Sequence, residues 1–149
     1  MINLNPAHWH LLVNHLPIVG SIIGLFILGY GIFSKAEVVI KMSYWLFIVL
    51  AVFAVIAKQT GEQAEGFIMN AKLADETLIE PHAQAADYAQ WAMIILGLIA
   101  LAALFINRLK MLKVMPIIVL ITALVAAGLM GWTGFLGGEI MHKEIRITK

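Results

Sequence analysis

Apolar residues fill four long stretches of this chain, and most charged residues lie in the segments between them. The four stretches are Leu11 to Phe33, Met42 to Ala57, Tyr88 to Ile106 and Val114 to Ile140. Each is close to the ~20 residues with which an α-helix crosses about 30 Å of hydrocarbon. The pattern predicts an all-α, integral membrane four-helix bundle in which residues 1–149 form a single four-span membrane domain.

The overall composition favours the same class of protein. Hydrophobic residues make up 62% of the chain and charged residues 13%, whereas soluble domains have about 25% charged residues. The net charge is +1 and no basic run is present, so we expect no nucleic-acid partner. The sequence also contains no Ser-His-Asp order, phosphate loop or HExxH motif that would indicate hydrolytic chemistry.

Cysteine is absent from the chain. Disulfides, thiolate metal sites, iron–sulfur clusters and covalently attached haem are therefore excluded. A metal would have to be held by nitrogen, oxygen or methionine sulfur.

The charges between the spans predict the orientation of the chain in the membrane. The segments between spans one and two and between spans three and four hold five cations and one anion: Lys35, Glu37, Lys41, Arg108, Lys110 and Lys113. The positive-inside rule assigns these segments to the cytoplasm. We therefore expect a multi-pass protein of the bacterial inner membrane whose N- and C-termini are both periplasmic.

Local signals predict where some helices begin. Asn5 followed by Pro6 is a typical N-cap and first helical residue, so the first helix should start before its histidines. Glu80 followed by Pro81 predicts the start of the third helix. Between the second and third helices, Thr60 to Asn70 has the pattern of a short amphipathic segment that could lie on the bundle or the membrane surface.

All five histidines fall at segment ends that this topology places on the outer side: His8, His10, His15, His82 and His142. Histidine is polar, titratable and a common metal ligand, and it is rare within membrane spans. A single histidine near a span end is often only an interfacial residue, and we interpret His8 in this way. The other four together indicate a functional site on the outer side.

Helical spacing places three of these histidines on faces built from small residues. Steps of three and four residues connect His10, Asn14, Pro17, Ser21 and Gly24; His82, Ala86, Ala89, Met93, Gly97 and Ala100; and Ala123, Ala127, Gly131, Gly134, Gly138 and His142. His8 and His15 share a different face of the first helix. Small residues also let membrane helices approach one another closely, so most of these glycines are expected to serve packing.

Imidazoles on facing helices are the axial ligands of b-type haems, and faces of glycine and alanine leave room for the flat porphyrin. The candidate axial ligands are His10, His15, His82 and His142, for one haem b or two. Thr60, Gln63 and Glu139 are candidates for contacts with haem propionates or with the ligand nitrogens. Alternatively, His10, His82 and His142 at one level could hold copper or zinc, with Met69 or Met141 as a soft fourth ligand for cuprous ion.

Several segments together resemble a known family. Residues 10–18, HLLVNHLPI, resemble the HPLLVHFPI opening of a widespread family of small bacterial membrane proteins of unknown function. Residues 60–65, TGEQAE, are similar to its TGExAE segment, and residues 137–140, GGEI, to its closing GGxL. His82 stands where the family has its loop histidine, so the resemblance covers nearly the whole chain in order and spacing.

The resemblance implies a four-helix membrane domain with outward-facing histidines, in a family suspected of binding haem. It assigns the family's histidine positions to His10, His15 and His82. The chain departs from the pattern at three positions: Leu11 replaces a proline, Asn14 is inserted in the first motif, and His142 stands where an aromatic residue is common.

The sequence therefore predicts a haem b protein that transfers electrons at the periplasmic side of the membrane. Its expected partners are membrane lipid, a quinol or redox-protein partner, and other membrane subunits or further copies of itself. An electron carrier or subunit is a better match than a stand-alone enzyme. Two alternatives remain open: a structural or accessory subunit of a larger complex, and a copper- or zinc-binding membrane protein.

Overall fold

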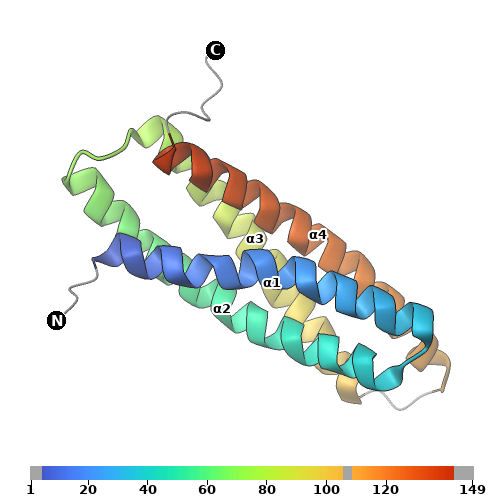
Figure 1. The fold of residues 1–149 in the computed structure, drawn as a ribbon. Helices are drawn as coiled ribbons and strands as arrows, with labels where there is room; N and C mark the ends of the chain where they lie inside the picture. The colour runs from blue at the N-terminus through green and yellow to red at the C-terminus, as the bar shows by residue number, and fades with distance from the viewer. Residues whose placement is uncertain (1–4, 106–108, 143–149) are drawn as a thin grey trace.

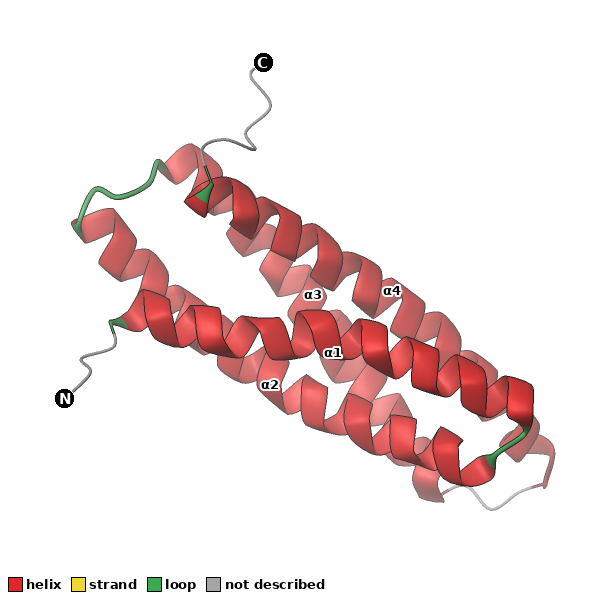
Figure 2. Ribbon diagram, in the orientation of Figure 1, coloured by secondary structure: helices red, strands yellow, loops and turns green. Residues whose placement is uncertain are grey.

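The computed structural model describes residues 5–105 and 109–142 of the chain. Four helices account for nearly all of them: α1 (Pro6–Ser34), α2 (Glu37–Asn70), α3 (Glu76–Phe105) and α4 (Leu109–Met141). They run alternately up and down as an antiparallel bundle (Figure 1). The described residues form no strand, and short loops join α1 with α2 and α2 with α3 (Figure 2). The predicted all-α four-helix bundle is confirmed.

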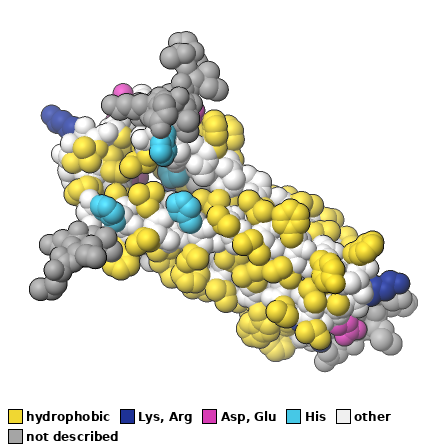
Figure 3. Space-filling view, in the orientation of Figure 1, with side chains coloured by type: hydrophobic (Ala, Val, Ile, Leu, Met, Phe, Trp, Pro, Cys, Tyr) yellow, Lys and Arg dark blue, Asp and Glu magenta, His cyan; other side chains and the backbone are white. Residues whose placement is uncertain are grey.

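Each of the four helices is long and apolar enough to cross a membrane. The shortest candidate span, Val114–Met141, has 28 residues, or about 42 Å at 1.5 Å per residue. The outward-facing side chains are largely apolar; Phe26 and Phe33, for example, are 76% and 88% exposed. Figure 3 shows hydrophobic side chains along the length of one face and charged side chains near its two ends. This distribution is typical of a bundle whose solvent is lipid.

Small residues bring the helices close together around the core. Each helix packs on its two neighbours in the order α1, α2, α3, α4, and the contact between α1 and α4 is the least extensive. At Gly24 of α1, an added Cβ would lie only 2.5 Å from the ring of Phe47, which is fully buried on α2. At Gly97 of α3, an added Cβ would lie 2.6 Å from the Cβ of Ala51. These glycines serve helix packing, as their spacing predicts.

The start of α1 is as predicted, whereas α3 begins earlier than expected. Asn5 caps α1, and its side chain accepts a hydrogen bond from the backbone N–H of His8 at 3.0 Å. The third helix starts at Glu76 rather than at Glu80 and Pro81. The Asp75 carboxylate accepts a hydrogen bond from the Thr77 N–H at 3.4 Å, so capping by Asp75 adds one turn ahead of the proline.

The predicted amphipathic segment between the second and third helices is not a separate element. Residues Thr60 to Asn70 are the last turns of α2, and only residues 71–75 connect α2 with α3. Gly61 and Gly66 each weaken a helix by about 1 kcal/mol relative to alanine. Tertiary packing overrides this cost, because Ala64 is buried in the bundle and Gly61 lies against the His10 ring. The apolar face of this segment therefore contacts other helices.

All five histidines lie at one end of the bundle, as predicted. His8, His10 and His15 are in the first three turns of α1, His82 is in the second turn of α3, and His142 directly follows α4. The connection between α2 and α3 is at the same end (Figure 1). Ile106, Arg108 and the tail after His142 lie outside the described residues, as do the side chains of Lys110 and Lys113.

Candidate functional site

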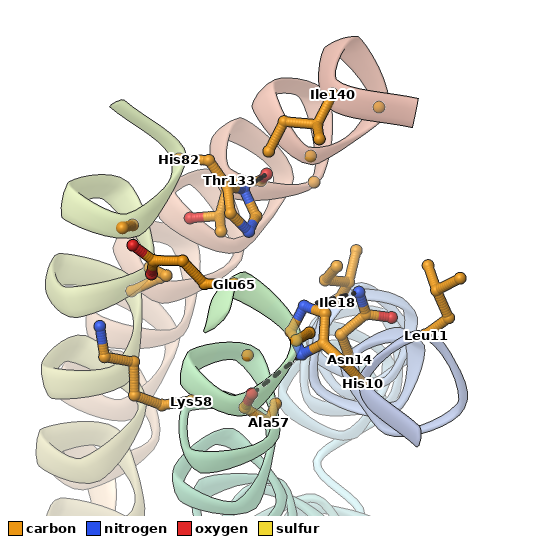
Figure 4. A pocket seen from close by; sticks show the side chains of 18 of the residues that line it. His10, Leu11, Asn14, Ile18, Ala57, Lys58, Glu65, His82, Thr133 and Ile140 are labelled. Carbon is orange, nitrogen blue, oxygen red and sulfur yellow. Dashed lines mark hydrogen bonds between the residues drawn. The ribbon is translucent and has the colours of Figure 1, made fainter. Parts of the chain in front are cut away.

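A cavity of about 480 Å³ lies between the four helices at the histidine end of the bundle (Figure 4). Four of the five histidines line it: His10, His15, His82 and His142. Most of the other lining residues are apolar side chains or glycines. The volume is within the range of roughly 300 to 1,000 Å³ that is common for small-molecule and cofactor sites.

His10 of α1 is held in place by α2. Its Nδ1 lies 3.0 Å from the carbonyl oxygen of Ala57. A carbonyl only accepts hydrogen bonds, so Nδ1 carries the hydrogen and the Nε2 of the neutral ring is left with a lone pair. Thr60 lies beside this contact, with its hydroxyl donating to the same carbonyl at 3.0 Å. A Cβ added at Gly61 would be 3.1 Å from His10 Cε1, so the ring rests where α2 has no side chain.

His82 of α3 is held in the same way by α4. Its Nδ1 lies 3.0 Å from the carbonyl oxygen of Thr133, so this ring also keeps its hydrogen on Nδ1 and its lone pair on Nε2. A Cβ added at Gly137 would be 3.0 Å from His82 Cε1. In both halves of the bundle, the carbonyl and the glycine that receive the imidazole are therefore four residues apart on the next helix.

The His10 and His82 rings project into the same space between the helices (Figure 4). Their centroids are 6.4 Å apart and their planes make an angle of 80°. Ring nitrogens that bind one metal from opposite sides, each about 2 Å from it, give ring centres about 6 Å apart. Metal-binding histidines usually donate their other ring N–H to a carbonyl or carboxylate. Spacing and tautomer thus both suit a single metal between the two rings.

Asn14, one turn after His10, adds a polar group to this wall. Its Nδ2 lies 3.4 Å from the Nε2 of His10. Its Oδ1 is buried and has no hydrogen-bond partner among the described residues. The α1 wall of the cavity thus contains a buried acceptor that the described part of the protein leaves unsatisfied.

The other histidines have different surroundings. His15 is exposed, and its Nδ1 donates to the Leu11 carbonyl of its own helix at 2.7 Å. It lines the same cavity as His10 although its helical spacing assigns it to a different face. His142 is exposed at the end of α4 and also lines the cavity. His8 does not line it, and its Nδ1 contacts the Asn5 side chain at 2.7 Å, in keeping with its interpretation as an interfacial residue.

The predicted level of three imidazoles is not formed. Across residues 5–105 and 109–142, no three His, Cys, Asp or Glu side chains are close enough together to hold one metal ion. His142 lies beyond the last turn of α4, whereas His10 and His82 lie within their helices. Met141 lines the cavity and Met69 does not. The arrangement offers a two-imidazole site.

Of the predicted auxiliary residues, Thr60 contacts a cavity histidine, with its Oγ1 3.4 Å from His10 Nδ1. Gln63 and Glu139 do not line the cavity. Gln63 is an exposed residue two positions after Gly61, where the helical turn carries it to another face of α2.

Sequence reasoning missed several groups that build the site. The Ala57 and Thr133 carbonyls carry no side-chain signal at all. Gly61 and Gly137 lie within the segments that resemble the family motifs. That resemblance was the sequence signal that could have identified these two glycines as part of the site.

Lys58 is a charged residue of the cavity wall that the sequence analysis did not predict as part of the site. Its Nζ lies 2.7 Å from Asp87 Oδ1 on α3 and 3.8 Å from Glu62 Oε1 on its own helix. The Lys58 side chain is only 19% exposed. Glu65 also lines the cavity (Figure 4). The part of the cavity wall around Lys58 is therefore charged.

Comparisons with protein-family models, with curated proteins and with solved structures find no match to this chain. The family resemblance of residues 10–18, 60–65 and 137–140 therefore stays a prediction.

Proposed function

We propose that this protein is a membrane b-type cytochrome that holds haem b between His10 and His82. The observation that carries the proposal is the pair of imidazoles from two different helical hairpins, 6.4 Å apart and each fixed through Nδ1 by a backbone carbonyl. Two neutral imidazole nitrogens are a sufficient and common axial ligand set for haem iron.

The cavity wall also suits a porphyrin. Glycine and alanine residues of several helices line it, and such faces leave room for a flat ring. Haem b is a large apolar ring with two carboxylates at one edge. Lys58, at the charged wall, is the cation that we assign to a carboxylate of the cofactor.

The backbone carbonyls of Ala57 and Thr133 keep each ring in the tautomer that a metal needs. They hold the hydrogen at Nδ1. This fixes the ring orientation and makes Nε2 more basic, and so a better metal ligand. When bound, haem b supplies one-electron chemistry through the ferric and ferrous states of its iron. Because both rings are held by backbone groups, the protein can keep the same ligands in both states, which suits electron transfer.

The remaining parts of the proposal come from the sequence. The positive-inside rule puts the histidine end at the periplasmic face of a bacterial inner membrane. We propose that quinol in the membrane supplies electrons and that a periplasmic or membrane-bound redox protein takes them, with this chain acting as a carrier or a subunit of a larger assembly or homo-oligomer. One haem is favoured over two, since His10 and His82 form one matched pair that a single haem would occupy.

An optical spectrum of the protein purified in detergent tests this proposal. We expect a Soret band and a reduced α-band typical of haem b, and loss of both in His10→Ala and in His82→Ala. His8→Ala is the matched control on the same helix and should leave the spectrum unchanged.

A pure, folded protein without these bands would contradict the haem proposal. Stoichiometric copper or zinc in such a sample would indicate a metal-binding protein, and the absence of any metal would favour an accessory subunit. An unchanged spectrum in both cavity variants would show that the ligands are elsewhere.

A further inference from the structure

The buried amide oxygen of Asn14 points to a second ligand in the same cavity. Asn14 is in the third turn of α1 and lines the cavity one turn after His10. Its Oδ1 is buried without a hydrogen-bond partner in the described part of the chain. A buried acceptor left unpaired costs about 1 to 3 kcal/mol, so native proteins rarely keep one unless a ligand or water satisfies it.

The hydrogen-bond pattern around His10 establishes which end of the amide is unpaired. The Ala57 carbonyl requires the hydrogen of the neutral ring to be on Nδ1, so Nε2 accepts. The Asn14 group 3.4 Å from Nε2 must therefore be the NH₂ group, which donates. The atom without a hydrogen-bond partner is therefore the amide oxygen, and its missing partner must supply an N–H or O–H. With haem bound, the iron would take the Nε2 lone pair and a propionate could accept from the NH₂ group instead, but ionised propionates have no hydrogen to donate, so the cofactor alone would not satisfy the oxygen.

The surroundings of the oxygen indicate what kind of molecule supplies the donor. Figure 4 shows Leu11 and Ile18 beside Asn14 on α1, and Ile140 on the α4 side of the cavity. Leu11, Ile18 and Ile140 form one margin of the cavity. The margin lies where α1 and α4 meet in the least extensive helix contact of the bundle. Leu11 is 38% exposed, and exposed side chains change rotamer within nanoseconds. The margin thus offers an apolar entrance from the lipid-facing side of the protein with a single buried acceptor behind it.

We propose that the margin of the cavity between α1 and α4 is a quinol-binding site, and that a phenolic hydroxyl of the quinol donates its hydrogen bond to Asn14 Oδ1. A quinol is a flat, lipid-soluble ring whose polar groups are hydroxyl donors, which matches an apolar entrance and one acceptor. This inference rests on the proposed function, because it specifies where the electron donor of that cytochrome binds. It assigns Asn14 the role of a binding residue.

Calorimetric titration of the purified protein in detergent with two probes tests the site. One probe is decylubiquinol, kept reduced under anaerobic conditions, and the other is the same molecule with both hydroxyls methylated. Any bound haem is reduced beforehand, so that the titration measures binding alone. Wild-type protein should bind the quinol about tenfold more tightly than the ether, as expected for one net hydrogen bond.

Asn14→Leu should remove this preference, because it replaces the acceptor with an apolar group of similar size. Ser34→Ala is the control. It removes a polar side chain of the same helix at the opposite end, where the Ser34 hydroxyl donates to the Tyr30 carbonyl, and it should keep the tenfold preference. Circular dichroism checks that each variant is folded, and Asn14→Ala replaces Asn14→Leu if the leucine variant does not assemble.

Equal binding of the two probes by wild-type protein, or a preference that survives in Asn14→Leu and Asn14→Ala, would overturn the inference and leave water as the partner of Oδ1. The Soret band of the same samples separates the two proposals. A preference that depends on Asn14 in protein without haem would support the quinol site alone. A haem spectrum without that preference would support the cytochrome alone.

Discussion

The two hairpins of the bundle, α1–α2 and α3–α4, hold their histidines in the same way but differ in what surrounds them. In each, an imidazole donates to a carbonyl on the next helix and rests against a glycine four residues further on. One turn after its histidine, however, α1 carries Asn14 where α3 carries Ala86. The common device indicates a shared task for the two rings, and the difference places the unpaired acceptor beside the histidine of α1 and an apolar methyl group beside that of α3.

The hairpins also use their glycines differently. Added Cβ atoms at Gly20 and Gly24 of α1 would each lie 2.5 Å from a side chain of α2. Added Cβ atoms at Gly128 and Gly131 of α4 would meet nothing within 4 Å. The contact between α1 and α2 therefore depends on Gly20 and Gly24, whereas Gly128 and Gly131 of α4 take no part in a close helix contact.

The largest expected effect comes from filling the space beside the two rings. Gly61→Val and Gly137→Val each place a branched side chain where a Cβ alone would already lie 3.1 Å or 3.0 Å from a Cε1 atom. Both changes should displace a ring and abolish or strongly broaden the Soret band, to the same extent in the two hairpins. Gly66→Val, on α2 with nothing within 4 Å, is the control and should leave the spectrum intact.

A spectrum that changes in only one of these two variants would break the equivalence of the hairpins. It would show that only the affected ring is a ligand. Helical content measured by circular dichroism separates ring displacement from a failure to fold.

A smaller effect, on stability, should distinguish the packing of the two hairpins. Gly24→Ala forces a methyl group against the buried Phe47 ring and should lower the free energy of unfolding by about 1 to 3 kcal/mol. Gly131→Ala meets nothing within 4 Å, and it should be neutral or stabilising by up to about 1 kcal/mol, because alanine favours the helix. Unfolding followed by circular dichroism during titration with a denaturing detergent compares the two. Equal losses in both variants would contradict the difference in packing.

The smallest effect concerns the charged wall between the hairpins. Lys58→Met removes a cation from the cavity and should lower the reduction potential of the haem, since a positive charge favours the ferrous state. Asp87→Asn removes the partner carboxylate, 2.7 Å from Lys58 Nζ, and should raise it. Shifts of roughly 20 to 60 mV are expected. A spectroscopic redox titration measures both, and shifts of the same sign would show that the pair does not act on the cofactor by its charge.

The fold could be predicted from the sequence further than the site could. Apolar stretches of membrane length and the Asn5 cap depend on local chemistry, and both predictions hold. The extents of α2 and α3 were wrong because packing and capping decided them: Ala64 and Gly61 contact other helices, and Asp75 starts α3 ahead of Pro81.

The site was predictable as a set of histidines but not as a pair. His10 and His82 were two of four candidates: helical spacing set His15 apart but not His142, and the family resemblance set His142 apart but not His15, so no single signal along the chain selects the pair. The groups that distinguish them are the backbone carbonyls of Ala57 and Thr133, which belong to other helices. Their contacts arise only when the hairpins pack, so helical spacing within a single span cannot indicate them.

Electron paramagnetic resonance of the oxidised, haem-containing protein tests most directly whether both rings bind one iron. The wild-type protein should give a low-spin ferric signal typical of two imidazole ligands. His10→Ala and His82→Ala should each lose it, and imidazole added together with haem should restore it in either variant by filling the vacated space. A low-spin signal that persists in both variants without added imidazole would contradict the account.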